Sequence, residues 1–137
     1  MANAKVTVPK AVNEPTKSYG PGSPEKVSLK TKLAELSNTT IEIPLIINGK
    51  EVRTGNTANC VMPHNHNHVL GTYHLASEVE VHEAIRVSQK AWKEWSTTPW
   101  EHRVSVFKKM ASLLQGPYRD TLNATTMLNV SKNAYQA

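Results

Sequence analysis

The hydrophobic pattern of this sequence changes its period near Ser77, and that change constrains the fold more than any other feature. Between Thr40 and Ala76, short runs rich in β-branched residues alternate with turn-forming residues, which predicts strands. After Ser77, apolar residues recur every three or four positions, which predicts helices. The first forty positions contain few large apolar side chains, so any packed core has to come from later residues. The chain is therefore predicted to be of the mixed α/β class, with a β ribbon followed by three helices.

The first part of the β ribbon is predicted to be a tight hairpin. Residues 41–47 and 50–54 flank Asn48-Gly49, and this dipeptide supplies the two positive φ angles of a type I′ turn. Pro44 has no amide hydrogen to donate to a neighbouring strand. We therefore expect the strand that contains Pro44 to lie at a sheet edge or to pair only in part.

A second hairpin is predicted from residues 57–62 and 68–76, joined by a polar turn over 63–67. Histidines at alternate positions of an extended strand point the same way, so they can meet a zinc or nickel ion. The candidate ligands are His64, His66 and His68, with Cys60 four residues before them and His74 six residues after. A turn destroys that alternation, and no carboxylate lies within the run. A polar turn is the preferred interpretation, and no metal ligand is assigned.

Two capping boxes mark the start of two predicted helices. Ser77 and Glu80 are spaced to satisfy each other's backbone donors, and Thr98 and Glu101 repeat the pattern with Pro99 at the first helical position. Each helix has one apolar face that is expected to be buried. The first face consists of Val81, Ala84, Ile85, Ser88, Ala91, Trp92 and Trp95, and the second of Val104, Phe107, Met110, Ala111 and Leu114.

Three tryptophans lie close together among basic residues, a combination that can bind single-stranded nucleic acid by stacking. They are Trp92, Trp95 and Trp100, interleaved with Lys90, Lys93 and Arg103. Because the tryptophans fall on the apolar faces of capped helices, packing in the core is the preferred interpretation. His82 and His102 fall on the polar sides of the same helices and are expected at the surface.

The last predicted helix follows the Gly116-Pro117 pair. Glycine accepts a left-handed helix end and proline cannot continue a helix, so the preceding helix is expected to stop there. The last helix is expected to run from Pro117 through Tyr135. No cap signal follows before Ala137, so the chain is expected to be the front portion of a larger protein.

Residues 1–25 are predicted to form an extended or disordered basic tail, because they contain several prolines and glycines. Six of the sixteen basic residues are lysines within the first 32 positions, so the net charge of +5 is attributed to this solvated region rather than to a nucleic-acid surface. Pro24 opens a short predicted helix that ends near Ser37. The remaining residues, 26–137, are predicted to form one partial domain.

Cys60 is the only cysteine, which excludes an internal disulfide and is compatible with a reducing compartment. A nucleophilic cysteine needs a helix N-terminus or a neighbouring cation, and Cys60 lies in a predicted strand, where a small apolar role is expected. Gly20-Pro21-Gly22 neither follows a strand nor opens a helix, so it is no dinucleotide fingerprint. No run is long enough to span a membrane, and no presequence is evident, since the first arginine is Arg53.

Several separate stretches share their order and spacing with one known family. They are Asn13-Glu14-Pro15, Gly22-Ser23-Pro24-Glu25, Ile43-Pro44, Pro63-His64-Asn65-His66 with His68, Trp92-Lys93-Glu94-Trp95, Arg103, Phe107, Leu113-Leu114-Gln115-Gly116-Pro117, Ser131-Lys132 and Gln136-Ala137. In these stretches the chain resembles the Δ1-pyrroline-5-carboxylate dehydrogenases, members of the aldehyde dehydrogenase superfamily. The resemblance covers most of the chain from about residue 13.

The resemblance implies the N-terminal part of an enzyme that oxidises glutamate γ-semialdehyde to glutamate with NAD in proline catabolism. In that family a cysteine thiolate attacks the aldehyde, hydride passes to the nicotinamide, and a glutamate-activated water releases the acid. The resemblance implies that all these groups lie beyond Ala137. No catalytic, cofactor-binding or metal-binding residue is therefore assigned, Cys60 included. The implied fold is an incomplete piece of a doubly wound NAD-binding domain.

The resemblance also implies NAD, a small-molecule substrate and a homo-oligomer for the full-length enzyme, without nucleic-acid or membrane partners. The implied compartment is the mitochondrial matrix or the cytoplasm. Alone, this chain is expected to be inactive, to bind no cofactor and to be marginally stable. Two alternatives stay open: a non-catalytic interaction module derived from an aldehyde dehydrogenase, and a histidine-rich metal-binding domain.

Overall fold

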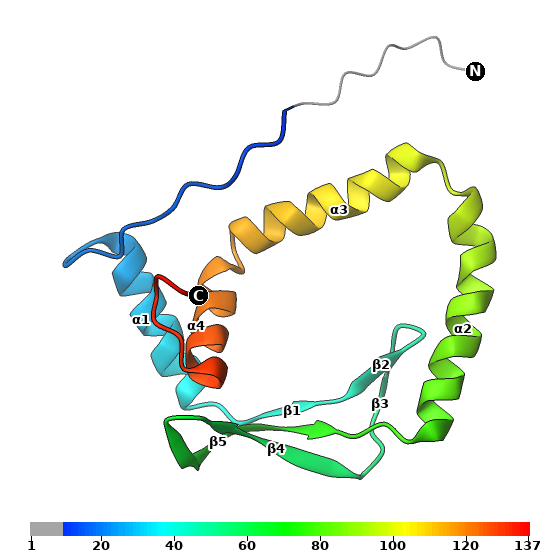
Figure 1. Cartoon of the computed structure of the whole chain (residues 1–137), viewed down its shortest axis with the longest axis horizontal. Helices are drawn as coiled ribbons and strands as arrows, with labels where there is room; N and C mark the ends of the chain where they lie inside the picture. Colours follow the sequence, from blue (N-terminus) through cyan, green and yellow to red (C-terminus); the bar gives the residue numbers. More distant parts are fainter. Residues whose placement is uncertain (1–9) are drawn as a thin grey trace.

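The structure is a computed structural model, and it describes residues 10–137. Helices and strands are mixed, in agreement with the predicted class. In chain order the elements are α1 (Pro24–Ser37), β1 (Ile41–Ile43), β2 (Leu45–Ile47), β3 (Lys50–Val52), β4 (Thr57–Met62), β5 (Asn65–His74), α2 (Glu78–Thr97), α3 (Trp100–Gln115) and α4 (Arg119–Val130). These elements form an open frame, in which α2 and α3 lead away from the strands and back to α4 (Figure 1).

The Asn48-Gly49 turn joins β2 and β3 as predicted, with φ angles of 53° and 71°. The strand predicted over 41–47 is divided at Pro44, so the prediction of limited pairing there is confirmed and that of a single strand is wrong. β1 pairs in parallel with β5, whereas β2 pairs antiparallel with β3. Pro44 cannot donate to a ladder, so the chain changes its pairing partner at this residue.

The predicted turn over 63–67 is too long. The turn occupies Pro63 and His64, and β5 begins at Asn65. β4 pairs antiparallel with β5, and the register shifts on both sides of Val61. At these shifts the ladder leaves residues without a partner, so a turn shorter than predicted is enough to join the two strands. β4 and β5 lie together with β1 in one three-stranded sheet, in the order β1-β5-β4.

The capping box of α2 is confirmed, since the Ser77 amide donates to the Glu80 carboxylate at 2.8 Å. The second predicted box is wrong. The Thr98 hydroxyl donates back to the Glu94 carbonyl of α2 at 3.0 Å, and Pro99 precedes α3 without a side-chain cap. Thr98 therefore satisfies a carbonyl at the end of α2 and is not available to α3.

Gly116 follows the end of α3 as predicted, but its φ of −103° is not left-handed. A Cβ at this position would lie 2.9 Å from the Ser112 carbonyl oxygen, so the close approach of the backbone is what requires glycine. The predicted extent of the last helix is wrong as well. α4 ends at Val130, because Ser131 adopts a left-handed conformation with a φ of 55°.

The buried core is small and lies where α1 packs on α4 beside β4. The buried apolar side chains are Leu29, Met62, Ala124 and Leu128. Leu29 lies in α1, so the prediction that the core comes only from residues after the first forty is wrong. The predicted burial of the α2 and α3 faces is wrong in this structure, since no residue of either helix is buried. Trp92 is 66% exposed and Phe107 63%. Local periodicity identified the faces, but the contacts of α2 with β2 and of α3 with α4 leave them largely exposed.

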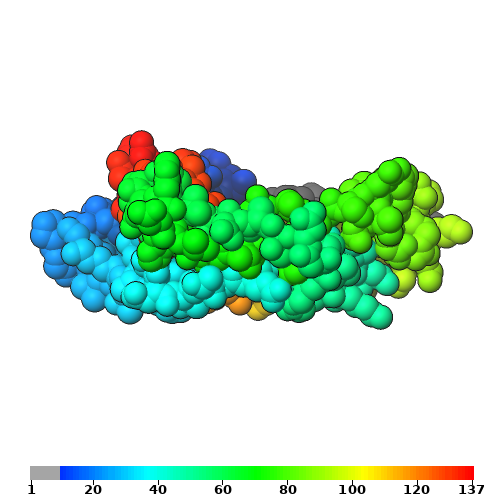
Figure 2. All heavy atoms as spheres, turned by 90° about the horizontal axis from the view of Figure 1, so that it is seen from below, coloured from blue at the N-terminus to red at the C-terminus, as the bar shows by residue number. Residues whose placement is uncertain are grey.

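The molecule exposes 10801 Å² of accessible surface, whereas a compact protein of 15.2 kDa exposes about 7,000 Å². Figure 2 shows the reason, a flat and elongated body in which α2 lies at one end, far from α1. Residues 10–19, which run without regular structure, add to the total (Figure 1). Among the described helices, none is long and apolar enough to cross a bilayer.

Residues 10–20 run without regular structure and touch α4. The Arg119 guanidinium donates to the Pro15 carbonyl at 3.3 Å, and the Asn123 amide donates to the Tyr19 hydroxyl at 3.0 Å. The first nine residues of the predicted tail lie outside the described residues.

We expect α2 and α3 to exchange their amide hydrogens faster than α1 and α4 do. The first pair contributes no side chain to the core, and local opening is easiest where few apolar contacts are broken. Hydrogen exchange followed by mass spectrometry on the purified chain measures this difference. Equal protection of all four helices would contradict it.

Candidate functional site

The predicted cluster of histidines is dispersed among different segments of the fold. His64 Nδ1 lies 2.8 Å from the Ser131 hydroxyl, just after α4. His68 Nε2 lies 2.8 Å from the carbonyl oxygen of Ser37, the last residue of α1. A carbonyl can only accept, so His68 donates and satisfies one of the free carbonyls at this helix end. Both histidines therefore connect the β4–β5 hairpin to helix ends.

His74 is the one buried polar side chain among the described residues, and it joins three segments. Its Nδ1 accepts the Gly55 amide hydrogen at 3.2 Å, so Nε2 bears the hydrogen that it donates to Glu42 at 2.8 Å. Arg53 donates to the same carboxylate at 3.1 Å. The hydrogen bonds from His74 and from Arg53 lower the pKa of Glu42 below its ordinary value. Glu42 thereby ties β1 to the end of β5 and to the residues after β3.

Among residues 10–137, no three side chains of His, Cys, Asp or Glu come close enough to hold a metal ion. His66 and His68 do lie in β5, where alternation is possible, because the turn is shorter than predicted. His68 is nevertheless bonded to α1, and His66 is exposed. His68 therefore connects β5 to the end of α1.

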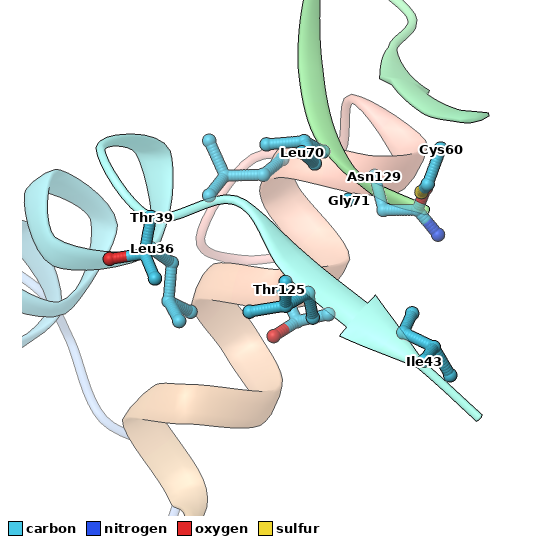
Figure 3. A pocket seen from close by; sticks show the side chains of 10 residues that line it. Leu36, Thr39, Ile43, Cys60, Leu70, Gly71, Thr125 and Asn129 are labelled. Atoms are coloured by element: carbon cyan, nitrogen blue, oxygen red, sulfur yellow. The ribbon is translucent and has the colours of Figure 1, made fainter. Parts of the chain in front are cut away.

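Cys60 lines an apolar cavity of about 130 Å³ between the sheet and α4 (Figure 3). Its thiol donates to the Asn129 amide oxygen at 2.9 Å, at one end of the cavity. Leu36 and Thr39 lie at the other end (Figure 3). Ligand pockets usually measure about 300–1,000 Å³, so this space fits a small apolar group at most. No cation or helix N-terminus lines the cavity to activate the thiol.

Gly71 lies at the centre of the three-stranded sheet, where sequence reasoning assigned it no role. A Cβ at this position would lie 2.6 Å from the Ile41 carbonyl oxygen and 2.8 Å from Ile41 Cγ1. Only glycine allows β1 to approach β5 this closely. An isolated glycine within a strand pattern is the signal that could have identified this approach.

The connection from β5 to α2 is a strand-to-helix junction, the kind that binds dinucleotide phosphates in doubly wound folds. It does not fit such a ligand here. Residues 75–77 contain no glycine, and Glu78 and Glu80 occupy the first turn of α2. Hydrogen bonds from the Ser77 hydroxyl and amide lower the pKa of Glu80, which keeps this helix end negative. An anionic pyrophosphate would be repelled from it.

The tryptophans are not in the core, contrary to the preferred interpretation from the sequence. They are Trp92, Trp95 and Trp100, and all three are exposed on α2 and at the start of α3. His82 and His102 are exposed as predicted. The aromatic side chains are therefore available for contact with something other than the described residues.

Comparison with known proteins identifies the family of this chain. The model of the aldehyde dehydrogenase family matches residues 51–137, and the chain belongs to this family. The relatives are more specific and confirm the resemblance found in the sequence. A Δ1-pyrroline-5-carboxylate dehydrogenase of Agaricus bisporus is 44% identical over all of this chain, which covers 26% of that protein. A mitochondrial enzyme of the same name from Dictyostelium discoideum is 38% identical over 98% of this chain, which covers 24% of it.

A solved structure agrees with these relatives. The Δ-pyrroline-5-carboxylate dehydrogenase of Mycobacterium tuberculosis, bound with NAD, superposes on 98% of this chain with a TM-score of 0.93 and 36% identity. The match covers 25% of that protein. The chain thus spans about a quarter of the length of its relatives and has the fold of a partial aldehyde dehydrogenase domain.

Replacing Gly71 by alanine is expected to destabilise the chain by about 1–3 kcal/mol, because the new Cβ would overlap the Ile41 backbone. Gly20→Ala is the matched control, because its Cβ would meet only the Ser18 hydroxyl at 3.7 Å. We expect the control to stay within about 0.5 kcal/mol of the parent. Urea unfolding followed by circular dichroism measures both. A Gly71→Ala variant as stable as the control would disprove the close approach.

Glu42 is expected to make the chain sensitive to acid. Its pKa is lower in the folded chain than in the unfolded one, so its contribution is complete above the unfolded pKa and is lost as the pH falls through the folded pKa. Glu42→Gln should therefore flatten the acid side of the stability profile. Glu94→Gln on exposed α2 should leave it unchanged. Urea unfolding at a series of pH values tests this, and parallel profiles for parent and Glu42→Gln would refute it.

Proposed function

We propose that this chain is the N-terminal quarter of an NAD-dependent dehydrogenase that oxidises glutamate γ-semialdehyde to glutamate in proline catabolism. The observation that carries the proposal is the 44% identity to a Δ1-pyrroline-5-carboxylate dehydrogenase along the whole chain. The superposition on an NAD-bound dehydrogenase of the same name supports it.

In this proposal the described residues act as a frame and not as a catalytic centre. Cys60 is bonded to Asn129 in a small apolar cavity, which supports a packing role for the thiol. The acidic first turn of α2 supports a cofactor site built from other residues. We therefore assign no catalytic, cofactor-binding or metal-binding residue within this chain. The nucleophile, the base and the NAD site belong to the remaining three quarters of such an enzyme.

The proposal extends to the compartment and the partners. The enzyme would act in the mitochondrial matrix, as the name of the Dictyostelium discoideum relative suggests, or in the cytoplasm. It would take a small-molecule substrate and assemble as a homo-oligomer when full length. Residues 26–137 would form one part of its NAD-binding domain, preceded by a tail over 1–25.

An exchange of segments between proteins tests the proposal. We expect a chimera, in which this chain replaces the matching quarter of the Agaricus bisporus relative, to form NADH from glutamate γ-semialdehyde. Its kcat/KM should fall within about tenfold of the parent enzyme, because an intact frame leaves transition-state contacts unchanged. Absorbance at the NADH band measures the rate.

The 137-residue chain by itself is the control and should form no NADH. A chimera that is folded, as judged by circular dichroism, but inactive would contradict the proposal. NADH formation by the isolated chain would sink the assignment of all catalytic groups to the other three quarters.

A further inference from the structure

A turn of three residues, Thr54-Gly55-Asn56, connects the two sheets of the molecule, and we call it the linking turn. It lies between β3 of the two-stranded sheet and β4 of the three-stranded sheet (Figure 1). The Leu75 amide donates to the Asn56 carbonyl at 2.8 Å, and the Thr54 hydroxyl donates to the Leu75 carbonyl at 3.0 Å. The linking turn is therefore bonded to the residue that directly follows β5, and this attachment helps to fix how the smaller sheet meets the larger one.

A further hydrogen bond of the linking turn depends on the protonation state of His74. The Gly55 amide donates to His74 Nδ1 at 3.2 Å, and this nitrogen can accept only while it bears no hydrogen. A proton on Nδ1 would set two donors against each other. The His74 side chain is only 4% exposed, so water has little access to replace the lost acceptor. Protonation of His74 therefore breaks the bond to Gly55.

The charged groups around His74 come from two other segments. Glu42 on β1 accepts from Nε2 at 2.8 Å, Arg53 after β3 donates to Glu42 at 3.1 Å, and Glu51 on β3 accepts from Arg53 at 2.8 Å. On β4 the residue paired with His74 is Thr57, which does not titrate. The hydrogen bonds from His74 and Arg53 lower the pKa of Glu42 below its ordinary value, so Glu42 stays ionised while an imidazole gains its proton.

We propose that His74 is an acid-sensitive switch, which holds the linking turn against the end of β5 when the ring is neutral and releases it when the ring is protonated. The bond from Nε2 to Glu42 persists in both states, because Nε2 bears a hydrogen in both. Acid therefore detaches the linking turn but leaves β1 attached to β5. The inference does not depend on the proposed function, since it concerns only contacts among the described residues.

Nuclear magnetic resonance on the 15N-labelled 137-residue chain tests the switch. Imidazole charge ordinarily changes between about pH 5 and 8, so spectra are recorded across that range. At the upper end we expect hydrogen on Nε2 of His74 only. On acidification Nδ1 should gain a hydrogen, and the Gly55 amide signal should shift with the same midpoint. The hydrogen-exchange protection of the Gly55 amide, corrected for the intrinsic effect of pH, should fall at least about fivefold, because a buried donor loses its acceptor. Amides of the β4–β5 ladder should keep their protection.

Two substitutions distinguish the two nitrogens of the ring. An asparagine oxygen lies about as far from the backbone as Nδ1, so His74→Asn retains an acceptor for the Gly55 amide that does not titrate. A glutamine amide nitrogen reaches about as far as Nε2, so His74→Gln retains the donor to Glu42 and removes the acceptor. We expect Gly55 to stay protected at every pH in His74→Asn and to be unprotected at every pH in His74→Gln. His102→Asn on exposed α3 is the matched control and should keep the pH dependence of the parent.

Three results would each overturn the inference. They are hydrogen on Nδ1 of His74 at the upper end of the pH range, a Gly55 amide whose signal and protection do not follow the His74 midpoint, and a His74→Asn variant that keeps the full pH dependence. The first two are measured on the parent chain, so they decide the question even if a variant fails to fold by circular dichroism. None of them bears on the proposed function, which the chimera tests separately.

Discussion

The parallel pairing of β1 with β5 is the contact on which the rest of this structure depends. It is the only parallel pairing among the described strands, and it brings the N-terminal residues onto the β4–β5 hairpin. Gly71 makes it possible, because any side chain there would strike the Ile41 carbonyl. α1 immediately precedes β1, so the same pairing sets the position from which α1 packs on α4. Leu29 of α1 and Leu128 of α4 are both buried in the small core.

The histidines reinforce this arrangement at its edges. His74 holds Glu42 of β1, while His68 closes the end of α1. The histidines favour a metal site as one hypothesis, but His68 and His74 each form a hydrogen bond with a different segment. The chemical reason is that a neutral imidazole has one donor and one acceptor, which suits a buried bridge between backbone groups and a carboxylate. The same side chains that suggested function thus stabilise the architecture.

The small core and the exposed helices α2 and α3 belong to a chain that is short for its family. The chain belongs to the aldehyde dehydrogenase family and spans about a quarter of the relatives' length. Amphipathic helices gain most of their stability from packing, not from intrinsic propensity. α2 begins at a capping box and α3 ends before Gly116, but no residue of either helix is buried. Their tryptophans therefore remain exposed, because the described residues do not cover these helices.

Signals within a few residues determined what the sequence could predict by itself. The Asn48-Gly49 turn and the Ser77 capping box depend on local φ angles and on donors close in the chain, and both are present. α3 also ends before Gly116 as predicted, although the reason is the close approach of Gly116 to the Ser112 carbonyl rather than a left-handed φ angle. The family resemblance could also be recognised from the sequence, because it depends on the order of residues alone. Tertiary structure decided the division of the first strand at Pro44, the partners of the histidines and the exposure of Trp92. These features depend on which distant segments meet, and periodicity shows that a face is apolar without showing what covers it.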